Sequence, residues 1–211
     1  MSPPNQSVVL WLTGFSGSGK STLATATADR LRQEGINVEI VDGDVLRSGQ
    51  NRDLGFSLAD RSENVRRASE LALRLAESGC VVIVALISPL RADRAASANR
   101  VRSHGLPFAE IFVNAPLAEC ERRDPKKLYQ RARAGQLTLF TGIDSPYEPP
   151  LKPDLDLHTD LETEAESAEK LSAFTLNVVR GVGQLGQRLV NPPATPGRDA
   201  ASNQAPGIAG P

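Results

Sequence analysis

Short apolar runs rich in β-branched residues alternate along the chain with segments in which apolar residues recur at helical spacing. The clearest runs begin at Val8, Ile36, Cys80 and Phe108, and a weaker one, DLDLHTD, begins at Asp154. The run CVVIVALI from Cys80 shows no alternation of apolar and polar positions, which is typical of a strand covered on both faces in a parallel sheet. We therefore predict four strands, with the segment from Asp154 as a candidate fifth.

Helical patterns fill the intervals between these runs. Segments 21–35 and 57–79 both end in a glycine, which is a common helix stop, and shorter patterns cover 92–101 and 163–181. Because strands and helices alternate, we expect an α/β fold: a doubly wound, mainly parallel sheet flanked by helices, with right-handed crossovers.

The composition changes near the C-terminus. From about Leu185 the chain is rich in Pro, Gly, Ala and Asn and has little to bury. The 211 residues suit one domain. We therefore predict a single domain over 1–181 and a disordered tail over 182–211.

A glycine-rich segment follows the first strand and precedes the first helix. Gly14-Phe15-Ser16-Gly17-Ser18-Gly19-Lys20-Ser21 fits the P-loop pattern G-x-x-x-x-G-K-[ST], and it stands in the strand–loop–helix context that this motif requires. Its backbone N–H groups and the helix N-terminus would cradle a polyphosphate. Lys20 would reach the β- and γ-phosphates of ATP, and the Ser21 hydroxyl would ligate Mg²⁺. The predicted nucleotide-binding residues are Gly14, Ser16, Gly17, Ser18, Gly19, Lys20, Ser21 and Thr22.

The class of P-loop protein follows from what surrounds this motif. The N-K-x-D segment of P-loop GTPases is missing from the sequence, and the strand that ends in carboxylates is the second one, at Asp42 and Asp44. Asp42 is well placed to orient or deprotonate an acceptor hydroxyl, as a small kinase needs. Arg47 and Arg61 are candidate cations for the transferring phosphoryl group, whereas Arg67 and Arg74 are interpreted as part of a solvated helix face.

Four longer segments make the chain similar to a known family. DGDVLRSGQNRDLGFSLADRSENVRR, ISPLRADR, RDPKKLYQRARAG and FTGIDSPYE resemble, in this order, the motifs of adenylylsulfate kinase, a P-loop NTPase-type fold. The resemblance covers the chain from Val8 to about Gly181. It implies the reaction of ATP with adenylylsulfate to give ADP and 3′-phosphoadenylylsulfate, with Mg²⁺, in sulfate assimilation.

The resemblance also implies roles for individual residues. Lys20, Asp42 and Ser88 match catalytic positions, with Asp42 meeting the acceptor 3′-hydroxyl. Arg61 would face the phosphosulfate, and Phe56 and Phe140 match a pair that clamps the acceptor adenine by stacking. The implied acceptor-site residues are Asp44, Val45, Leu46, Arg47, Phe56, Arg61, Ser62, Glu63, Asn64, Ile87, Ser88, Lys126, Leu139 and Phe140.

Ser88 is expected in the acceptor site. Bacterial members of the family carry a proposed phosphoserine at this serine. Direct in-line transfer needs only positioning, charge neutralisation and metal, so we do not expect an obligatory covalent intermediate.

The chain departs from the family pattern at several acceptor-site positions. Val45 replaces the usual Asn, Ser48 a His, and Thr138-Leu139 the customary Lys-Gly. Two alternatives therefore stay open. The chain could be a kinase of another nucleotide-like or small hydroxyl acceptor, or a catalytically idle nucleotide-binding module that docks to ATP sulfurylase.

Charge and composition bound the partners. The formal net charge is −1, which gives no sign of a nucleic-acid or membrane surface, and no apolar run approaches the roughly 20 residues of a membrane span. Cys80 and Cys120 are interpreted as reduced, buried thiols. We expect a cytoplasmic protein, and the resemblance implies a homodimer with a functional link to a separate ATP sulfurylase.

Overall fold

The computed structural model of this protein describes residues 7–190 and places them around a parallel sheet. Its five strands lie in the order β2-β3-β1-β4-β5, and all neighbours run parallel. The strands are β1 (Val8–Thr13), β2 (Val38–Asp42), β3 (Val81–Ala85), β4 (Phe108–Asn114) and β5 (Leu155–His158). The predicted α/β class and the candidate fifth strand are both confirmed.

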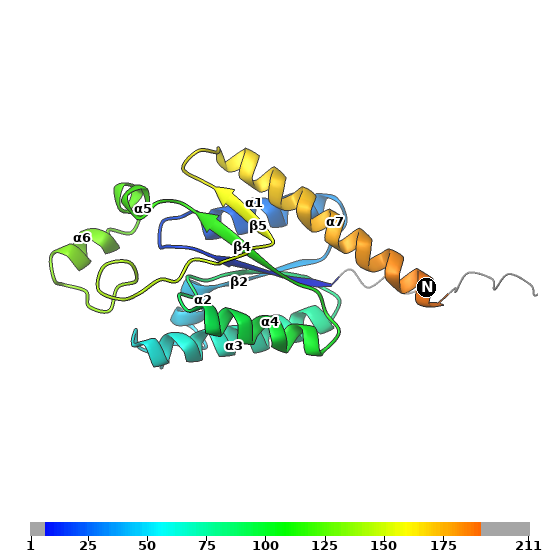
Figure 1. Cartoon of the computed structure of the whole chain (residues 1–211), viewed down its shortest axis with the longest axis horizontal. Coiled ribbons are helices and arrows are strands. Elements are labelled where there is room, and N and C mark those ends of the chain that lie inside the picture. Colours follow the sequence, from blue (N-terminus) through cyan, green and yellow to red (C-terminus); the bar gives the residue numbers. More distant parts are fainter. Residues whose placement is uncertain (1–6, 191–211) are drawn as a thin grey trace, which may run out of the picture.

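Helices cover both faces of the sheet (Figure 1). One face carries α1 (Lys20–Gln33) and α7 (Glu164–Val190), and the other carries α3 (Leu58–Glu77) and α4 (Arg91–Ser103). Alternate residues of β1 serve the two layers: Leu10 packs with the α1 and α7 cluster, whereas Trp11 packs with the α3 and α4 cluster. Because both faces are buried, polar side chains can gather only at the edge of the sheet where the strands end.

Three short helices were missed by the sequence analysis: α2 (Gly43–Ser48), α5 (Leu117–Arg123) and α6 (Leu128–Arg133). None is long enough for a repeating apolar face, so periodicity could not detect them. The segment after Asp42 begins with α2 because the Asp42 carboxylate accepts hydrogen bonds from the N–H groups of Asp44 and Val45. Helices α5 and α6 lie beyond the ends of the strands (Figure 1).

The C-terminal helix is longer than the sequence indicated. Helix α7 continues to Val190 and so passes the predicted domain boundary at residue 181. The rest of the predicted tail, 191–211, lies outside the described residues, and its disorder stays a prediction. No helix within residues 7–190 is long and apolar enough to cross a membrane.

The centre of the sheet gives a test of core packing. Ile83 lies fully buried on β3, between β2 and β1. We expect Ile83→Ala to lower the free energy of unfolding by about 2–5 kcal/mol, because it removes buried methyl groups and leaves a cavity. Denaturant titration measures the change. Leu151→Ala is the control, since Leu151 is 83% exposed and its loss should cost less than about 0.5 kcal/mol.

Candidate functional site

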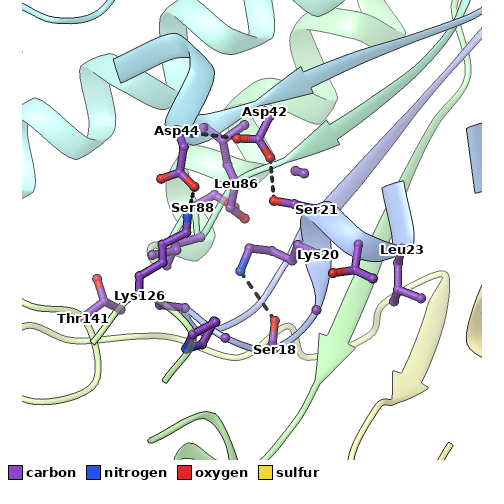
Figure 2. A pocket seen from close by; sticks show the side chains of 18 of the residues that line it. Ser18, Lys20, Ser21, Leu23, Asp42, Asp44, Leu86, Ser88, Lys126 and Thr141 are labelled. Atoms are coloured by element: carbon purple, nitrogen blue, oxygen red, sulfur yellow. Dashed lines mark hydrogen bonds and ion pairs between the residues drawn. The ribbon is translucent and has the colours of Figure 1, made fainter. Parts of the chain in front are cut away.

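A cavity of about 700 Å³ lies where the strands end, and the glycine-rich segment after β1 forms part of its wall. Figure 2 shows Lys20 and Ser21 on one side of this cavity and Asp42, Asp44, Ser88 and Lys126 around the remainder. These side chains come from segments far apart in the sequence. The fold therefore brings together the predicted phosphate cradle and the predicted acceptor residues.

The path of the P-loop depends on Gly14. Its φ is 152°, and a Cβ atom there would lie 2.4 Å from the Val113 carbonyl oxygen on β4. Only glycine tolerates that backbone and that approach. The loop then ends at Gly19, and α1 begins at Lys20, so the free N–H groups of the first helical turn face the cavity.

Side chains from elsewhere in the fold hold the carbonyl groups of this loop. Tyr129 Oη donates to the Ser16 oxygen at 2.9 Å, and Thr159 Oγ1 donates to the Ser18 oxygen at 2.8 Å. Arg123 approaches the Gly17 oxygen at 3.5 Å and donates to the Thr159 carbonyl at 2.6 Å. In a trans peptide the N–H points away from the preceding carbonyl. These contacts therefore turn the N–H groups of Gly17 and Gly19 away from the surrounding protein.

Lys20 is the buried cation of the cradle. Its Nζ donates to the carbonyl oxygens of Gly14 at 3.0 Å and Phe15 at 2.6 Å, and among the described residues it forms no ion pair. Burial lowers the pKa of Lys20 to about 8, although the negative charges of Asp42 and Asp44 oppose that shift. An ammonium desolvated in this way favours an anionic partner.

Asp42 joins the cradle to the acceptor side. Its Oδ2 accepts a hydrogen bond from Ser21 Oγ at 2.6 Å, and its Oδ1 caps α2 through the Asp44 N–H at 2.8 Å. Asp44 in turn forms an ion pair with Lys126, which stands between α5 and α6 (Figure 2). One carboxylate is thus fixed at both oxygens beside the predicted metal ligand.

The acceptor side combines an exposed ring with two guanidinium groups. The Phe56 ring is 54% exposed, and the guanidinium carbons of Arg47 and Arg61 lie 4.6 and 5.5 Å from its centroid. Among the described residues neither arginine has a carboxylate ion-pair partner. Burial lowers the pKa of Arg61, and the nearby charge of Arg47 lowers it further. Two unpaired cations beside an aromatic ring suit an anionic ligand that carries a planar base.

Phe140 lies on the opposite segment of the same cavity. Its ring meets Tyr129 edge-on, with centroids 4.9 Å apart and an interplanar angle of 83°. Arg61 ties the two aromatic segments together, because it donates to the carbonyl oxygens of Phe56 at 3.1 Å and Leu139 at 2.6 Å. Both predicted clamp residues therefore line one space, and a single buried arginine bridges their backbones.

Comparisons with known proteins agree with this geometry. The family model of adenylylsulphate kinase matches residues 6–158. The chain belongs to this family. An adenylyl-sulfate kinase of Geotalea daltonii is 54% identical over 152 residues, which are 71% of this chain and 73% of that protein. The bifunctional enzyme CysN/CysC of Mycobacterium tuberculosis is 51% identical over 151 residues, 72% of this chain but only 25% of that longer protein.

Solved structures give the same assignment. The Mycobacterium tuberculosis APS kinase CysC in complex with AMPPNP and APS superposes with a TM-score of 0.79 at 48% identity, covering 82% of this chain and 98% of that one. The family and the P-loop fold that the sequence predicted are confirmed, and the kinase class with them.

Ser88 of this adenylylsulfate kinase family member lies at the cavity wall with its side chain turned into the sheet. Its Oγ accepts a hydrogen bond from the Trp11 indole N–H at 3.0 Å, and Ser88 is only 2% exposed. Its φ of 40° is unusual for a residue other than glycine. Arg94 and Thr13 hold this strained turn, since Arg94 donates to the Ser88 carbonyl and Thr13 to the Ile87 carbonyl, both at 2.7 Å.

Most predicted site residues share the cavity. Those that line it are Ser16, Gly17, Ser18, Gly19, Lys20, Ser21, Thr22, Asp42, Asp44, Arg47, Phe56, Arg61, Asn64, Ile87, Ser88, Lys126 and Phe140. Six predicted residues lie outside its lining: Gly14, Val45, Leu46, Ser62, Glu63 and Leu139.

Each of the six has a physical reason for its position. Leu46 is buried in the core beneath α2, while Val45 on the opposite side of the helix is 68% exposed. Ser62 donates to Asp93, and Glu63 forms ion pairs with Arg66 and Arg67 on the outer face of α3. Gly14 and Leu139 contribute carbonyl oxygens, to Lys20 and Arg61 respectively. These six residues thus lie outside the cavity lining, and their roles in nucleotide or acceptor binding stay predictions.

The cavity also contains residues that the sequence analysis did not single out. They are chiefly the segment after β5 and the end of α5: Arg123, Pro125, Thr141, Thr159, Glu162, Thr163, Glu164 and Ser167. Arg123 stands in the basic run RRDPKK, and the sequence of this run does not show which of its cations lines the cavity. The segment after β5 has no motif of its own, and only the sheet order brings it beside the P-loop.

The lowered pKa of Lys20 predicts a pH dependence of nucleotide binding. A bound polyphosphate favours the ammonium and so raises the pKa of Lys20 above about 8. The affinity for the nucleotide should therefore be highest below pH 8 and fall as pH rises above 8, by up to about tenfold per pH unit. Above pH 8, binding should also be accompanied by proton uptake. Calorimetry of a non-hydrolysable ATP analogue in buffers of different ionisation enthalpy measures both. A flat affinity between pH 7 and 10 would contradict the prediction.

Proposed function

We propose that this protein transfers the γ-phosphoryl group of ATP to the 3′-hydroxyl of adenylylsulfate, giving ADP and 3′-phosphoadenylylsulfate. The observation that carries the proposal is the single cavity that holds a P-loop with Lys20 at one side and Phe56, Phe140 and the unpaired arginines at the other. A nucleotide donor and a nucleotide acceptor with an anionic tail fit such a two-part site. The relatives named above support the same reaction.

The P-loop binds the donor phosphates. The N–H groups of Gly17 and Gly19 and the start of α1 would surround the β-phosphate, and the Lys20 ammonium would move from the loop carbonyls to the transferring phosphoryl group. Arg123 and Thr159, which line the cavity beside the loop, would flank the rest of the donor nucleotide.

Asp42 is the group that handles the acceptor proton. Its carboxylate stands at the end of β2, within reach of both the cradle and the acceptor side, and it is held at both oxygens before any ligand arrives. We propose that it orients the 3′-hydroxyl and accepts its proton as the new O–P bond forms. Arg47 and Arg61 would bind the phosphosulfate and so hold the 3′-hydroxyl of the ribose in line with the γ-phosphoryl group.

The residues present fit a magnesium ion. Ser21 Oγ and Asp42 Oδ2 lie 2.6 Å apart at the cavity wall, and both are hard oxygen donors of the kind Mg²⁺ takes. The described residues contain no cluster of three or more His, Cys, Asp or Glu, so the ion would rely on these oxygens together with substrate phosphates and water, as Mg²⁺ usually does. Bound there, it would neutralise charge on the phosphoryl oxygens.

Ser88 acts in this proposal through position rather than as a phosphoryl carrier. Its hydroxyl oxygen accepts a hydrogen bond from the buried Trp11 indole. Attack on the γ-phosphoryl group would have to come from a serine that is only 2% exposed. Direct in-line transfer to the acceptor needs no such attack.

Assembly and location are also proposals. Family resemblance supports a homodimer and a functional link to ATP sulfurylase, which forms a compound of the kind this site accepts. The cytoplasmic location stays a prediction from the sequence.

Asp42→Asn tests whether Asp42 accepts the proton of the 3′-hydroxyl. Asparagine caps helices as well as aspartate does, so α2 and the fold should be retained while the proton acceptor is lost. We expect kcat to fall by about 10²–10⁴-fold in a coupled assay of adenylylsulfate-dependent ATP consumption, with the 3′-phosphorylated product identified by mass. Asp53→Asn, which changes an exposed carboxylate paired with Arg67, is the control and should keep activity.

The same assay separates the alternatives. A kinase of another acceptor would turn over a sugar or a different nucleotide and leave adenylylsulfate untouched. An idle module would bind the ATP analogue without turnover of any acceptor.

The aromatic clamp gives a test on affinity. Phe56→Ala and Phe140→Ala should each raise KM for adenylylsulfate by about 5–150-fold, since stacking of one base on one ring contributes about 1–3 kcal/mol. KM for ATP should change much less with Phe56→Ala, because the Phe56 ring packs against Arg47 and Arg61 of the acceptor side. Unchanged KM for adenylylsulfate in both variants would remove the clamp from the mechanism.

A further inference from the structure

Tyr129 lies behind the cavity and contacts both of its halves. It belongs to α6, is 1% exposed and does not line the cavity. Its hydroxyl donates to the Ser16 carbonyl of the P-loop at 2.9 Å, and its ring packs edge-on against Phe140 at 4.9 Å between centroids. One rigid side chain thus joins the nucleotide cradle to an aromatic wall of the acceptor side.

At the cradle, the hydroxyl determines the direction of one peptide group. Holding the Ser16 carbonyl towards Tyr129 turns the Gly17 N–H the other way, towards the space where phosphate would bind. Without this bond the Ser16–Gly17 peptide loses a fixed partner and can rotate. A phosphate bound to the Gly17 N–H would in turn hold the Ser16 carbonyl, and with it the Tyr129 hydroxyl, in place.

At the acceptor side, the ring limits where Phe140 can lie. Tyr129, Cys120 and Ala115 form a small buried cluster, against which Phe15 of the P-loop and Phe140 also pack. Phe140 therefore rests on the same side chain that the P-loop carbonyl orients. Burial raises the pKa of Tyr129, so its hydroxyl remains a proton donor throughout the working range.

We propose that Tyr129 is a positioning residue that couples the two substrate sites, so that occupation of the nucleotide cradle strengthens binding at the acceptor clamp and the reverse. The first ligand to bind orders the Ser16 peptide, Tyr129 and Phe140 and bears the loss of conformational entropy. The second ligand binds to residues that are already ordered, so its affinity is higher, which is positive cooperativity. The inference rests on the proposed acceptor, adenylylsulfate.

The test is a pair of binding titrations on the full-length protein. The Kd of adenylylsulfate is measured by calorimetry without and with a saturating non-hydrolysable ATP analogue, and the ratio of the two is the coupling factor. In the unchanged protein we expect a factor of about 5–150. In Tyr129→Phe, which keeps the ring and removes only the hydroxyl, the factor should fall to within about twofold of one, and the analogue alone should bind about fivefold more weakly.

Tyr147→Phe is the matched control. It removes the same atom from the other tyrosine, whose hydroxyl lies 3.0 Å from Thr13 Oγ1 and makes no contact with a P-loop carbonyl. It should retain the coupling factor. Phe140→Leu is the reciprocal variant: it should lose the coupling while the analogue alone binds within about twofold of the unchanged protein.

Three results would overturn the proposal: a coupling factor of one in the unchanged protein, an unaltered factor in Tyr129→Phe, or an equal loss in Tyr147→Phe. Failure of the proposed function is recognised separately, because the unchanged protein would then not bind adenylylsulfate at all. In that case the analogue titration of Tyr129→Phe against Tyr147→Phe still decides the cradle part of the inference. Thermal unfolding of each variant checks that the fold is retained.

Discussion

The P-loop can present its N–H groups to a phosphate only if its carbonyl groups have partners elsewhere, and the site depends on this requirement. From Ser16 to Ser18 every carbonyl is held by a side chain from another part of the fold: the first by Tyr129, the second by Arg123 and the third by Thr159. A buried carbonyl without a partner is costly, so the loop would otherwise turn some of these groups over. The segments α5, α6 and the loop after β5 therefore help to build the cradle.

The same segments also carry the acceptor side. Lys126 stands between α5 and α6 and pairs with Asp44, and Tyr129 supports Phe140. Donor and acceptor regions thus share their supports instead of forming two independent pockets. Phosphoryl transfer benefits from this arrangement, because it requires two nucleotides in a fixed mutual position more than it requires any covalent chemistry from the protein.

Departures from the family pattern lie at the edge of the acceptor side. Leu139 has a φ of 59°, in the left-handed region that glycine, the customary residue there, adopts without strain. The strain is tolerated because the backbone is held on both sides: the N–H groups of Leu139 and Phe140 bond to Asp144, and the Leu139 carbonyl bonds to Arg61. Val45 points outward from α2. The replacement of the family's polar asparagine by valine at this position therefore leaves the described contacts of Asp42 and Asp44 intact.

The sequence alone determined the parallel sheet, its flanking helices, the P-loop and the position of Asp42 at a strand end, because these depend on local periodicity and on motifs whose residues are consecutive. It also distinguished Arg61, which is buried at the site, from Arg67, which pairs on the surface with Asp53. Only the tertiary structure decided that Leu46 belongs to the core and that Tyr129 and Thr159 support the cradle. The P-loop partners of Tyr129 and Thr159 lie more than a hundred residues away along the chain, and no local pattern records a contact that arises only when the strands take their order in the sheet.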